Sequence, residues 1–436
     1  MTSFLWLAGV TGALSLLTPC VFPMIPITVT YFGGNANRSR AAVLGDALLF
    51  AGGIVVTFTA LGLGLALLVG ASGLARLAAN PWVNIAIGLS FVAFALNLMG
   101  VWELRLRFID RTVNTADAAA RNRPASAAAS LLMGFAFTLA SFTCTAPFVG
   151  PLLVSAARGD WHRPLVGMLV FSIVFSAPFF ILAVLPGFMR HLPKPGSWMV
   201  SLRFLVGLAE LGASLKFFSN ADLVWRTHAI SRNAIVASWA ALALVGALYL
   251  LIPIVTSRGN KRLSIPRAFA TVVCAAMAFM IAQGVRGKSL GDLEAFLPPP
   301  DISEEGVGGA LATNSVSNQR WIMNDHAAAL AQARKTGKLV LIDFTGYTCT
   351  NCRWMESNIF ARPDVAAALD GYVLSRLYTD GQGKLYENQQ DFQERQFGTV
   401  ALPLYAIVDS SGRTIRTFAG LTRSPAEFLA FLGRLS

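Results

Sequence analysis

The chain has 436 residues, of which 55% are hydrophobic and 13% are charged, and its formal net charge is +12. This composition, with a mean hydropathy of +0.57, excludes an ordinary soluble domain and places most of the chain in a lipid bilayer. The basic residues fall in short clusters between apolar runs. We therefore expect these basic residues to interact with membrane lipid and not with nucleic acid.

The chain is apolar from Phe4 onward, without the positive region and small-residue cleavage site of a signal peptide. We interpret this start as a retained membrane segment, and a natural start further upstream stays open. A spanning helix needs about 20 apolar residues. The sequence predicts about eight such helices, with approximate limits 4–32, 43–70, 82–102, 127–156, 164–188, 199–218, 234–255 and 266–284. Prolines in the first and fourth indicate broken or re-entrant helices.

Loop charges predict the orientation of these helices. Alternate loops are richer in Arg and Lys, with clusters at 38–40, 105–123, 190–194 and 258–262. The positive-inside rule places these loops in the cytoplasm and both termini outside. We therefore expect a multi-pass membrane protein whose C-terminal domain is periplasmic or otherwise extracytoplasmic.

Composition divides the chain into a transmembrane domain at 1–288, a polar linker at 289–319 and a soluble domain at 320–436. In the soluble part we expect helices at 325–335 and 350–359, and strands at 338–344, 404–408 and 414–418. Asp409-Ser410-Ser411-Gly412 indicates a hairpin turn, and Ser424 the N-cap of a last helix that begins with Pro425. Helices that alternate with strands predict an α/β domain.

Two cysteines in this domain form the motif Cys349-Thr350-Asn351-Cys352 between a strand and a helix. A helix N-terminus stabilises a thiolate, so we expect Cys349 to be the nucleophile and Cys352 the resolving thiol. Half of a zinc site and an inert structural disulfide are the alternatives. The four histidines show no ligand spacing with the cysteines, so we expect no metal and no bound cofactor.

Two carboxylates accompany this motif. Asp343 lies in an apolar strand six residues before Cys349, where a lone buried carboxylate is costly and its pKa rises. Glu356 lies four residues beyond Cys352 on the same helix face and could share a proton-handling role. A solvated surface position is the alternative for Glu356.

Cys20 and Cys144 each begin a Cys-x-x-Pro motif with a further proline, one in the first predicted span and one in the fourth. The three-span separation predicts an inverted repeat, in which both thiols meet near the midplane at broken helices. Two unrelated structural cysteines are the alternative. Cys274 has no such context and is interpreted as a small apolar filler. Glu210 and Lys216 lie within or near the end of the sixth span, where charges are costly and often functional. A structural pair or a Lys216 that snorkels to the interface is the alternative, and neither residue is included in the predicted site.

The soluble domain resembles the thioredoxin superfamily. Asp343 matches its buried acid, and Leu402-Pro403 matches its cis-proline element, while Tyr347-Thr348 stands where thioredoxins carry a tryptophan. With the membrane motifs, nearly the whole chain resembles the DsbD-type thiol:disulfide interchange proteins and the shorter CcdA-type transporters. The resemblance implies a set of site residues, namely Cys20, Cys144, Cys349, Cys352, Asp343, Glu356 and Pro403.

The resemblance also implies a function. Cytoplasmic thioredoxin, supplied with electrons by NADPH, would reduce the membrane cysteine pair, which would reduce the soluble pair, which would reduce oxidised periplasmic proteins, with cytochrome c maturation among the uses. Full-length members begin with a signal peptide and an immunoglobulin-like domain, so we expect either a separate acceptor protein or a domain missing from this sequence. An inward-running thiol oxidase, a small-molecule transporter with an accessory thioredoxin domain and an assembly scaffold are the rival hypotheses.

Overall fold

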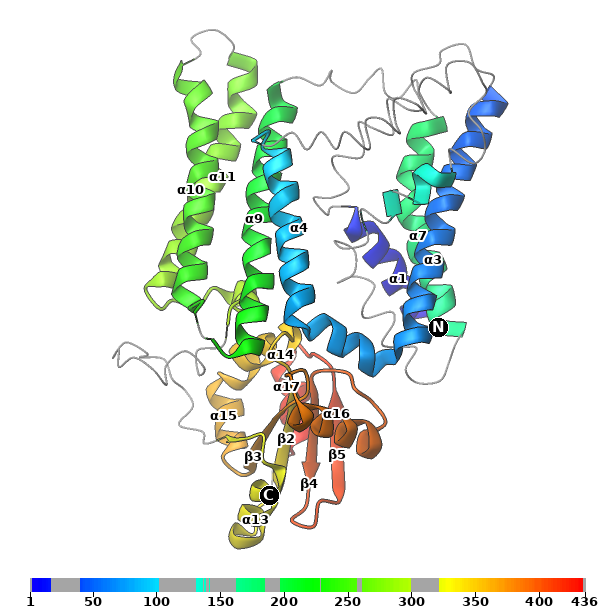
Figure 1. The fold of residues 1–436 in the computed structure, drawn as a ribbon. Coiled ribbons are helices and arrows are strands. Elements are labelled where there is room, and N and C mark those ends of the chain that lie inside the picture. Colours follow the sequence, from blue (N-terminus) through cyan, green and yellow to red (C-terminus); the bar gives the residue numbers. More distant parts are fainter. Residues whose placement is uncertain are drawn as a thin grey trace. The chain divides into compact units, whose positions relative to one another are not determined.

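The computed structural model describes residues 2–16, 40–101, 131–135, 137–138, 141, 162–184, 197–227, 229–256, 261–298 and 321–433 (Figure 1). The chain divides into two compact units. One comprises Met1–Leu74 with Val92–Glu210, and the other comprises Ala75–Phe91 with Leu211–Ser436.

Long apolar helices make up most of the described part before residue 290. They are α1 (Thr2–Ser15), α3 (Arg40–Ala79), α4 (Pro81–Leu98), α7 (His162–Val184), α9 (Ser197–Trp225), α10 (Arg232–Thr256) and α11 (Lys261–Val285). All seven overlap predicted spans: α1 overlaps the first part of the span expected at 4–32, and the six helices from α3 to α11 overlap six others. By length and composition, four helices in the described ranges can cross a membrane: those in α3, α4, α10 and α11. The membrane-helix class is thus confirmed, and the number of spans stays a prediction.

The core of the first unit is a cluster of phenylalanines. Phe58 of α3 packs edge-on against Phe171 and Phe175 of α7, with ring centroids 5.6 and 5.3 Å apart. The helix α1 approaches α7 closely, because a Cβ at Gly12 would lie 2.8 Å from the carbonyl oxygen of Phe171. Buried hydroxyls bond to their own helix, as Thr57 does to the carbonyl of Gly53 at 2.6 Å. This satisfies polar groups that lipid or a dry core cannot.

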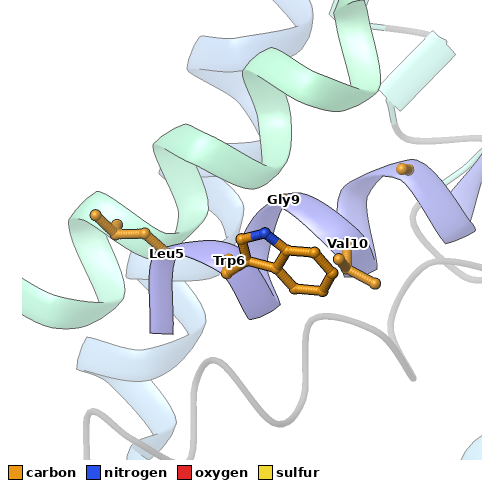
Figure 2. A pocket seen from close by; sticks show the side chains of 5 residues that line it. Leu5, Trp6, Gly9 and Val10 are labelled. Carbon is orange, nitrogen blue, oxygen red and sulfur yellow. The ribbon is translucent and has the colours of Figure 1, made fainter. Parts of the chain in front are cut away.

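A shallow apolar pocket in the same unit is lined by residues of α1 (Figure 2). Leu5, Trp6, Gly9, Val10 and Ala13 line it, and the Trp6 side chain is largely exposed. Such an apolar lining suits lipid contact and offers no group for proton or electron transfer.

In the second unit α10 packs along α11 (Figure 1). Arg232 at the start of α10 pairs with Glu294 at 2.6 Å, and Glu294 belongs to the short 3-10 helix η2 (Gly291–Phe296). Trp239 of α10 donates its indole N–H to the carbonyl of Gly212 in α9 at 2.9 Å. These contacts connect α9, α10 and η2 within this unit.

The C-terminal part folds around a five-stranded sheet. Its strands are β1 (Ile322–Met323), β2 (Val340–Thr345), β3 (Val373–Tyr378), β4 (Leu404–Val408) and β5 (Thr414–Ala419), in the order β1-β3-β2-β4-β5. The pairs β1/β3 and β3/β2 are parallel, and β2/β4 and β4/β5 are antiparallel. The helices are α13 (His326–Thr336), α14 (Thr350–Met355), α15 (Pro363–Leu369), α16 (Lys384–Phe397) and α17 (Pro425–Leu432).

The two faces of this sheet have separate cores, because successive side chains of a strand point to opposite faces. Leu341 and Leu374 pack with residues of α14, α15 and α17, whereas Ile342 and Phe344 pack with α13 and α16 residues. Asp343 follows the period of Leu341 and therefore points to the α14 side of the sheet.

The predicted elements of this domain are present, with the strand at 404–408 unchanged. Ser424 caps α17 by accepting from the N–H of Glu427, with Pro425 at the first position, as expected. The helix expected at 350–359 changes character instead: α14 ends at Met355, and Glu356–Phe360 forms a π-helical turn, η3. Four further elements, β1, β3, α15 and α16, are not predicted from the sequence.

Candidate functional site

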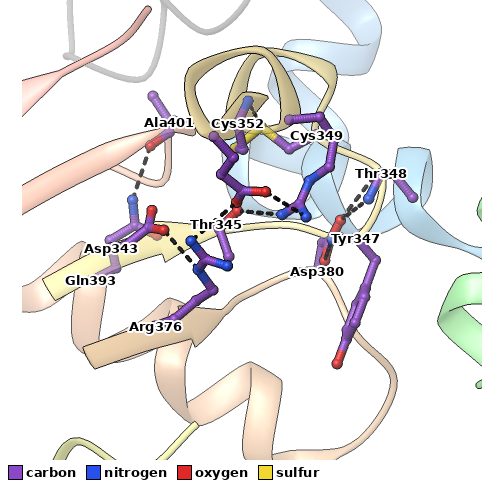
Figure 3. Close-up of a disulfide and its surroundings, with 12 residues drawn as sticks. Asp343, Thr345, Tyr347, Thr348, Cys349, Cys352, Arg376, Asp380, Gln393 and Ala401 are labelled. Carbon is purple, nitrogen blue, oxygen red and sulfur yellow. Dashed lines mark hydrogen bonds and ion pairs between the residues drawn. A yellow bond between two sulfur atoms is a disulfide. The ribbon is translucent and has the colours of Figure 1, made fainter. Parts of the chain in front are cut away.

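Cys349 and Cys352 form a disulfide in the structure, with their Cα atoms 5.3 Å apart (Figure 3). Cys349 is the N-cap residue of α14, and its sulfur accepts a hydrogen bond from the N–H of Cys352 at 3.1 Å. Cys349 is half-buried and Cys352 is buried. The accessible sulfur thus lies at the helix N-terminus, where backbone N–H groups stabilise a thiolate.

Asp380 holds the loop that leads to Cys349. Its carboxylate accepts hydrogen bonds from the N–H groups of Tyr347 and Thr348, at 2.7 and 2.9 Å, and from the Thr348 hydroxyl at 2.9 Å. A Cβ at Gly346 would lie 2.6 Å from the Asp380 carboxylate, so this close approach requires glycine. Burial raises the pKa of Asp380, and the three hydrogen bonds oppose that rise because they favour the charged carboxylate.

A buried cluster of four charged side chains lies on the α14 side of the sheet. Arg376 Nε lies 2.9 Å from Asp343 Oδ2, and Arg376 Nη2 lies 3.6 Å from Glu356 Oε1. Arg353, which follows Cys352 in the chain, pairs with Glu356 at 2.7 Å and donates to the Thr345 hydroxyl at 3.1 Å. Two guanidinium groups therefore face two carboxylates, and one of these four residues, Arg353, directly follows Cys352 in the chain.

Asp343 is the most deeply buried carboxylate of this cluster, at 1% exposure. Burial raises its pKa to about 6, while the neighbouring Arg376 opposes the rise and Glu356 adds to it. Its Oδ2 oxygen accepts from Arg376. Its Oδ1 oxygen is buried and has no hydrogen-bond donor among the residues that the structure describes. This oxygen can therefore accept a proton.

Two aromatic residues border the charged cluster. The Arg376 guanidinium lies over the ring of Trp321, 4.2 Å from its centroid, a cation–π contact that fixes the plane of the guanidinium. Tyr405 is the register partner of Asp343 on β4. Burial, together with the negative charges of Asp343 and Glu356, raises the pKa of Tyr405 well above its usual value, so its hydroxyl stays protonated.

The Leu402-Pro403 peptide bond is cis, which agrees with the predicted cis-proline element. The carbonyl of Pro403 accepts from the N–H of Gly420 at 2.8 Å. A Cβ added at Gly346 would lie 3.1 Å from Cδ1 of Leu402, so the cis-proline loop adjoins the loop before Cys349.

Two residues near the disulfide in sequence, Trp354 and Tyr347, also contact residues in or next to helices of the same compact unit. Trp354 donates its indole N–H to Asp292 of η2 at 2.6 Å. Arg226, just beyond α9, donates to the Tyr347 hydroxyl at 3.1 Å. Tyr347 belongs to the pair that stands where thioredoxins carry a tryptophan, and it stacks on Tyr378 with ring centroids 4.1 Å apart.

The structure thus brings Asp343 and Glu356 together through Arg376, and places Cys349 and Cys352 in one disulfide. Three further residues that contact the predicted ones, Arg353, Arg376 and Asp380, are not predicted from the sequence. Arg353 could have been recognised from the sequence, because it directly follows Cys352 in an expected helix. Arg376 and Asp380 could not have been recognised, because neither β3 nor the turn after it is predicted from the sequence.

Cys20 and Cys144 lie outside the residues that the structure describes, so their pairing stays a prediction. Cys274, in α11, is a half-buried free cysteine. Within the described ranges, no group of three His, Cys, Asp or Glu side chains could hold a metal ion.

Apolar helices joined to a thioredoxin-like domain with an accessible disulfide define a membrane-bound thioredoxin-like protein. Residues 321–410 match a thioredoxin-like family model. Residues 1–221 match the family described as cytochrome c biogenesis protein transmembrane domain, and the chain belongs to this family.

Curated relatives carry the name thiol:disulfide interchange protein DsbD. The one from Vibrio vulnificus is 28% identical over 429 residues, which cover 96% of this chain and 65% of the relative. The one from Ralstonia nicotianae is 28% identical over 83% of this chain and 57% of the relative. A DsbD 2 from Pseudomonas aeruginosa is 28% identical over 84% and 60%. The chain thus spans less than two thirds of the length of these relatives.

Proposed function

We propose that this chain is a transmembrane protein-disulfide reductase. In this proposal cytoplasmic thioredoxin, reduced at the expense of NADPH, passes two electrons to Cys20 and Cys144 in the membrane. These reduce the Cys349–Cys352 disulfide, which then reduces oxidised proteins on the periplasmic side of a bacterial inner membrane. No bound cofactor is needed, because every step is a thiol–disulfide exchange. Apocytochromes in cytochrome c maturation are one class of acceptor.

The observation that carries the proposal is the disulfide itself. Its accessible sulfur, Cys349, lies at the N-terminus of α14, and its buried partner, Cys352, lies within the first turn. This is the arrangement of a nucleophilic and a resolving thiol. The contacts of Trp354 with Asp292 and of Tyr347 with Arg226 support transfer from the membrane helices, since they join the disulfide's rim to residues that adjoin those helices.

The exchange can be written atom by atom. The Cys349 thiolate attacks one sulfur of the acceptor disulfide, and the other acceptor sulfur leaves as a thiolate. Cys352 then loses its proton and attacks Cys349, which breaks the mixed disulfide and re-forms Cys349–Cys352. Two electrons have passed to the acceptor. Asp343 is proposed as the base that takes the Cys352 proton, with Glu356 and Pro403 shaping the site.

The energetics permit this direction of transfer. From thioredoxin at about −270 mV to a DsbA-like couple at about −120 mV, two electrons release about 7 kcal/mol. The transfer therefore needs no energy from the membrane. It requires only that the Cys20–Cys144 pair can react with a partner on each side of the membrane.

The test uses the full chain in proteoliposomes that enclose thioredoxin, thioredoxin reductase and NADPH, with the thiol state of Cys349 and Cys352 read by alkylation. We expect reduction in the wild type and none in the Cys20→Ala variant. Cys274→Ala is the matched control and should behave like the wild type. No reduction in the wild type would overturn the proposal. Reduction that survives Cys20→Ala would exclude the membrane pair as the carrier and leave the transporter hypothesis standing.

A further inference from the structure

Arg226 directly follows α9 in a backbone conformation that glycine usually adopts at a helix end. Its φ is +56°, in the left-handed region, where a residue with a Cβ is strained. The turn itself needs no arginine, because the backbone N–H of this residue donates to the carbonyl of Leu223 at 3.2 Å. The presence of arginine here is therefore explained by what its side chain contacts.

The Arg226 guanidinium contacts two tyrosines of the thioredoxin-like domain. Its Nη2 donates to the Tyr347 hydroxyl at 3.1 Å, and its carbon atom lies 5.8 Å from the centre of the Tyr386 ring. The hydroxyls of these tyrosines are 3.2 Å apart. Within the described ranges, no carboxylate pairs with Arg226. The Tyr347 hydroxyl is thus the acceptor that this guanidinium engages.

The end of α9 has the features of a membrane–water interface. Trp225 lies edge-on to Trp82 of α4, with ring centroids 5.4 Å apart, and both side chains are exposed. Exposed tryptophans at the ends of apolar helices are typical of this interface. Leu223 and Val224, on the same helix end, form a buried cluster with Tyr347. The hydrogen bond of Arg226 therefore lies where an apolar helix ends against the soluble domain.

Tyr347 belongs to the turn that ends at the nucleophile. The N–H of Cys349 donates to the carbonyl of Gly346 at 3.3 Å, which closes this turn around Tyr347. The N–H of Tyr347 donates to Asp380 at 2.7 Å, so the backbone of the turn is held within the domain. Its phenol hydroxyl contacts Arg226 instead. A residue at the end of α9 thus binds the same turn that contains Cys349.

We propose that Arg226 and Tyr347 form a specificity-determining pair for the reduction of the Cys349–Cys352 disulfide by the membrane cysteines. The inference rests on the proposed function. The phenol oxygen of Tyr347 can accept from a guanidinium, whereas the indole of a tryptophan, the residue that thioredoxins carry here, only donates. The pair therefore favours this domain over a thioredoxin-like domain without the hydroxyl. It exchanges no electron and no proton.

The test uses the full chain in proteoliposomes that enclose thioredoxin, thioredoxin reductase and NADPH. Tyr347→Phe keeps the ring and removes the hydroxyl, and Arg226→Gly suits the left-handed backbone, so it removes the side chain without straining the helix end. Each should slow reduction of Cys349–Cys352 about fivefold. The double variant should be no slower than either, because both remove one interaction. Tyr347→Trp should be as slow as Tyr347→Phe.

Two further measurements separate recognition from a structural role. Reduction of Arg226→Gly by a small dithiol in detergent should keep the wild-type rate. Hydrogen-exchange mass spectrometry in nanodiscs should show faster exchange at the Thr227 amide in Tyr347→Phe, since the contact joins the two segments. Arg286→Gly, which removes an exposed arginine just beyond α11, is the matched control and should behave like the wild type in every assay.

The outcomes distinguish this inference from the proposed function. A wild type that enclosed thioredoxin does not reduce would refute the proposed function. A wild type that is reduced, with Tyr347→Phe and Arg226→Gly equally fast, would overturn the inference alone. Slowing that multiplies in the double variant would also overturn it, because the two residues would then act independently. Unchanged exchange at Thr227 in Tyr347→Phe would show that the hydroxyl does not bind the end of α9.

Discussion

The carboxylate of Asp380 accepts two hydrogen bonds from Thr348, one from its N–H and one from its hydroxyl, each at 2.9 Å. A third comes from the N–H of Tyr347 at 2.7 Å. Asp380 is buried, so water cannot readily replace it as the acceptor for these donors. The position of Cys349, the next residue, therefore depends on a carboxylate from a distant turn.

Asp380→Ala should leave the buried N–H of Tyr347 and the partly buried N–H of Thr348 without their acceptor, at a cost of about 1–3 kcal/mol for the buried group. We expect faster hydrogen exchange at Tyr347 and Thr348 and about tenfold slower reaction of Cys349 with a disulfide. Hydrogen-exchange mass spectrometry and quenched-flow alkylation measure the two effects. The control is Asp364→Ala, which removes an exposed partner of Arg362. Unchanged exchange at both amides in Asp380→Ala would contradict the role of Asp380.

Asp343 should make the domain less stable as the pH rises. Its pKa is about 6 in the folded chain and 3.8 as a free side chain. Between these values the folded state holds a proton that the unfolded chain has released, so stability falls from about pH 4 to about pH 6. The change is on the order of 3 kcal/mol. Pulse proteolysis in urea of the full chain measures it, and Asp343→Asn should remove this part of the pH dependence. A stability that rises through this window in the wild type and not in the variant would reverse the assigned shift.

Cys352→Ser should trap Cys349 in a mixed disulfide with its acceptor. The nucleophile can still attack, but the resolving thiol that would release the acceptor is gone. Non-reducing gels and mass spectrometry of the purified chain would show the adduct. Cys349→Ser is the matched control, and we expect no adduct in it. Equal amounts of adduct in the two variants would show that Cys349 is not the attacking thiol.

The contact between Trp354 and Asp292 should matter for transfer from the membrane and not for the disulfide's own reactivity. Trp354→Phe keeps an aromatic ring and removes the N–H that donates to Asp292 at 2.6 Å. A single hydrogen bond of this kind is worth about 1 kcal/mol, so we expect about fivefold slower reduction by enclosed thioredoxin in proteoliposomes. Reduction by a small dithiol in detergent should stay unchanged. Equal slowing in both assays would show that Trp354 acts on the disulfide directly.

Much of the fold follows from local patterns. The apolar runs predict the helices from α3 to α11, and the cap of Ser424 and Pro425 predicts the start of α17. These features depend on neighbours in the chain, so they can be predicted without tertiary structure. The strand β3 was missed because Ser375 and Arg376 interrupt its apolar pattern, and both are buried by contacts that only the folded sheet provides.

Some features of the candidate site likewise follow from local sequence, and others depend on contacts between distant residues. The Cys349–Cys352 motif at a helix start and the buried position of Asp343 can be predicted from the sequence, because residue spacing and strand period decide both. The pairing of Arg376 with Asp343, and the contact of Asp380 with the loop before Cys349, depend on how the folded chain brings distant segments together. Parallel strands are paired by a crossover, so residues 33 positions apart meet only when the sheet register is set. That register is a property of the packed core, and no short stretch of sequence carries it.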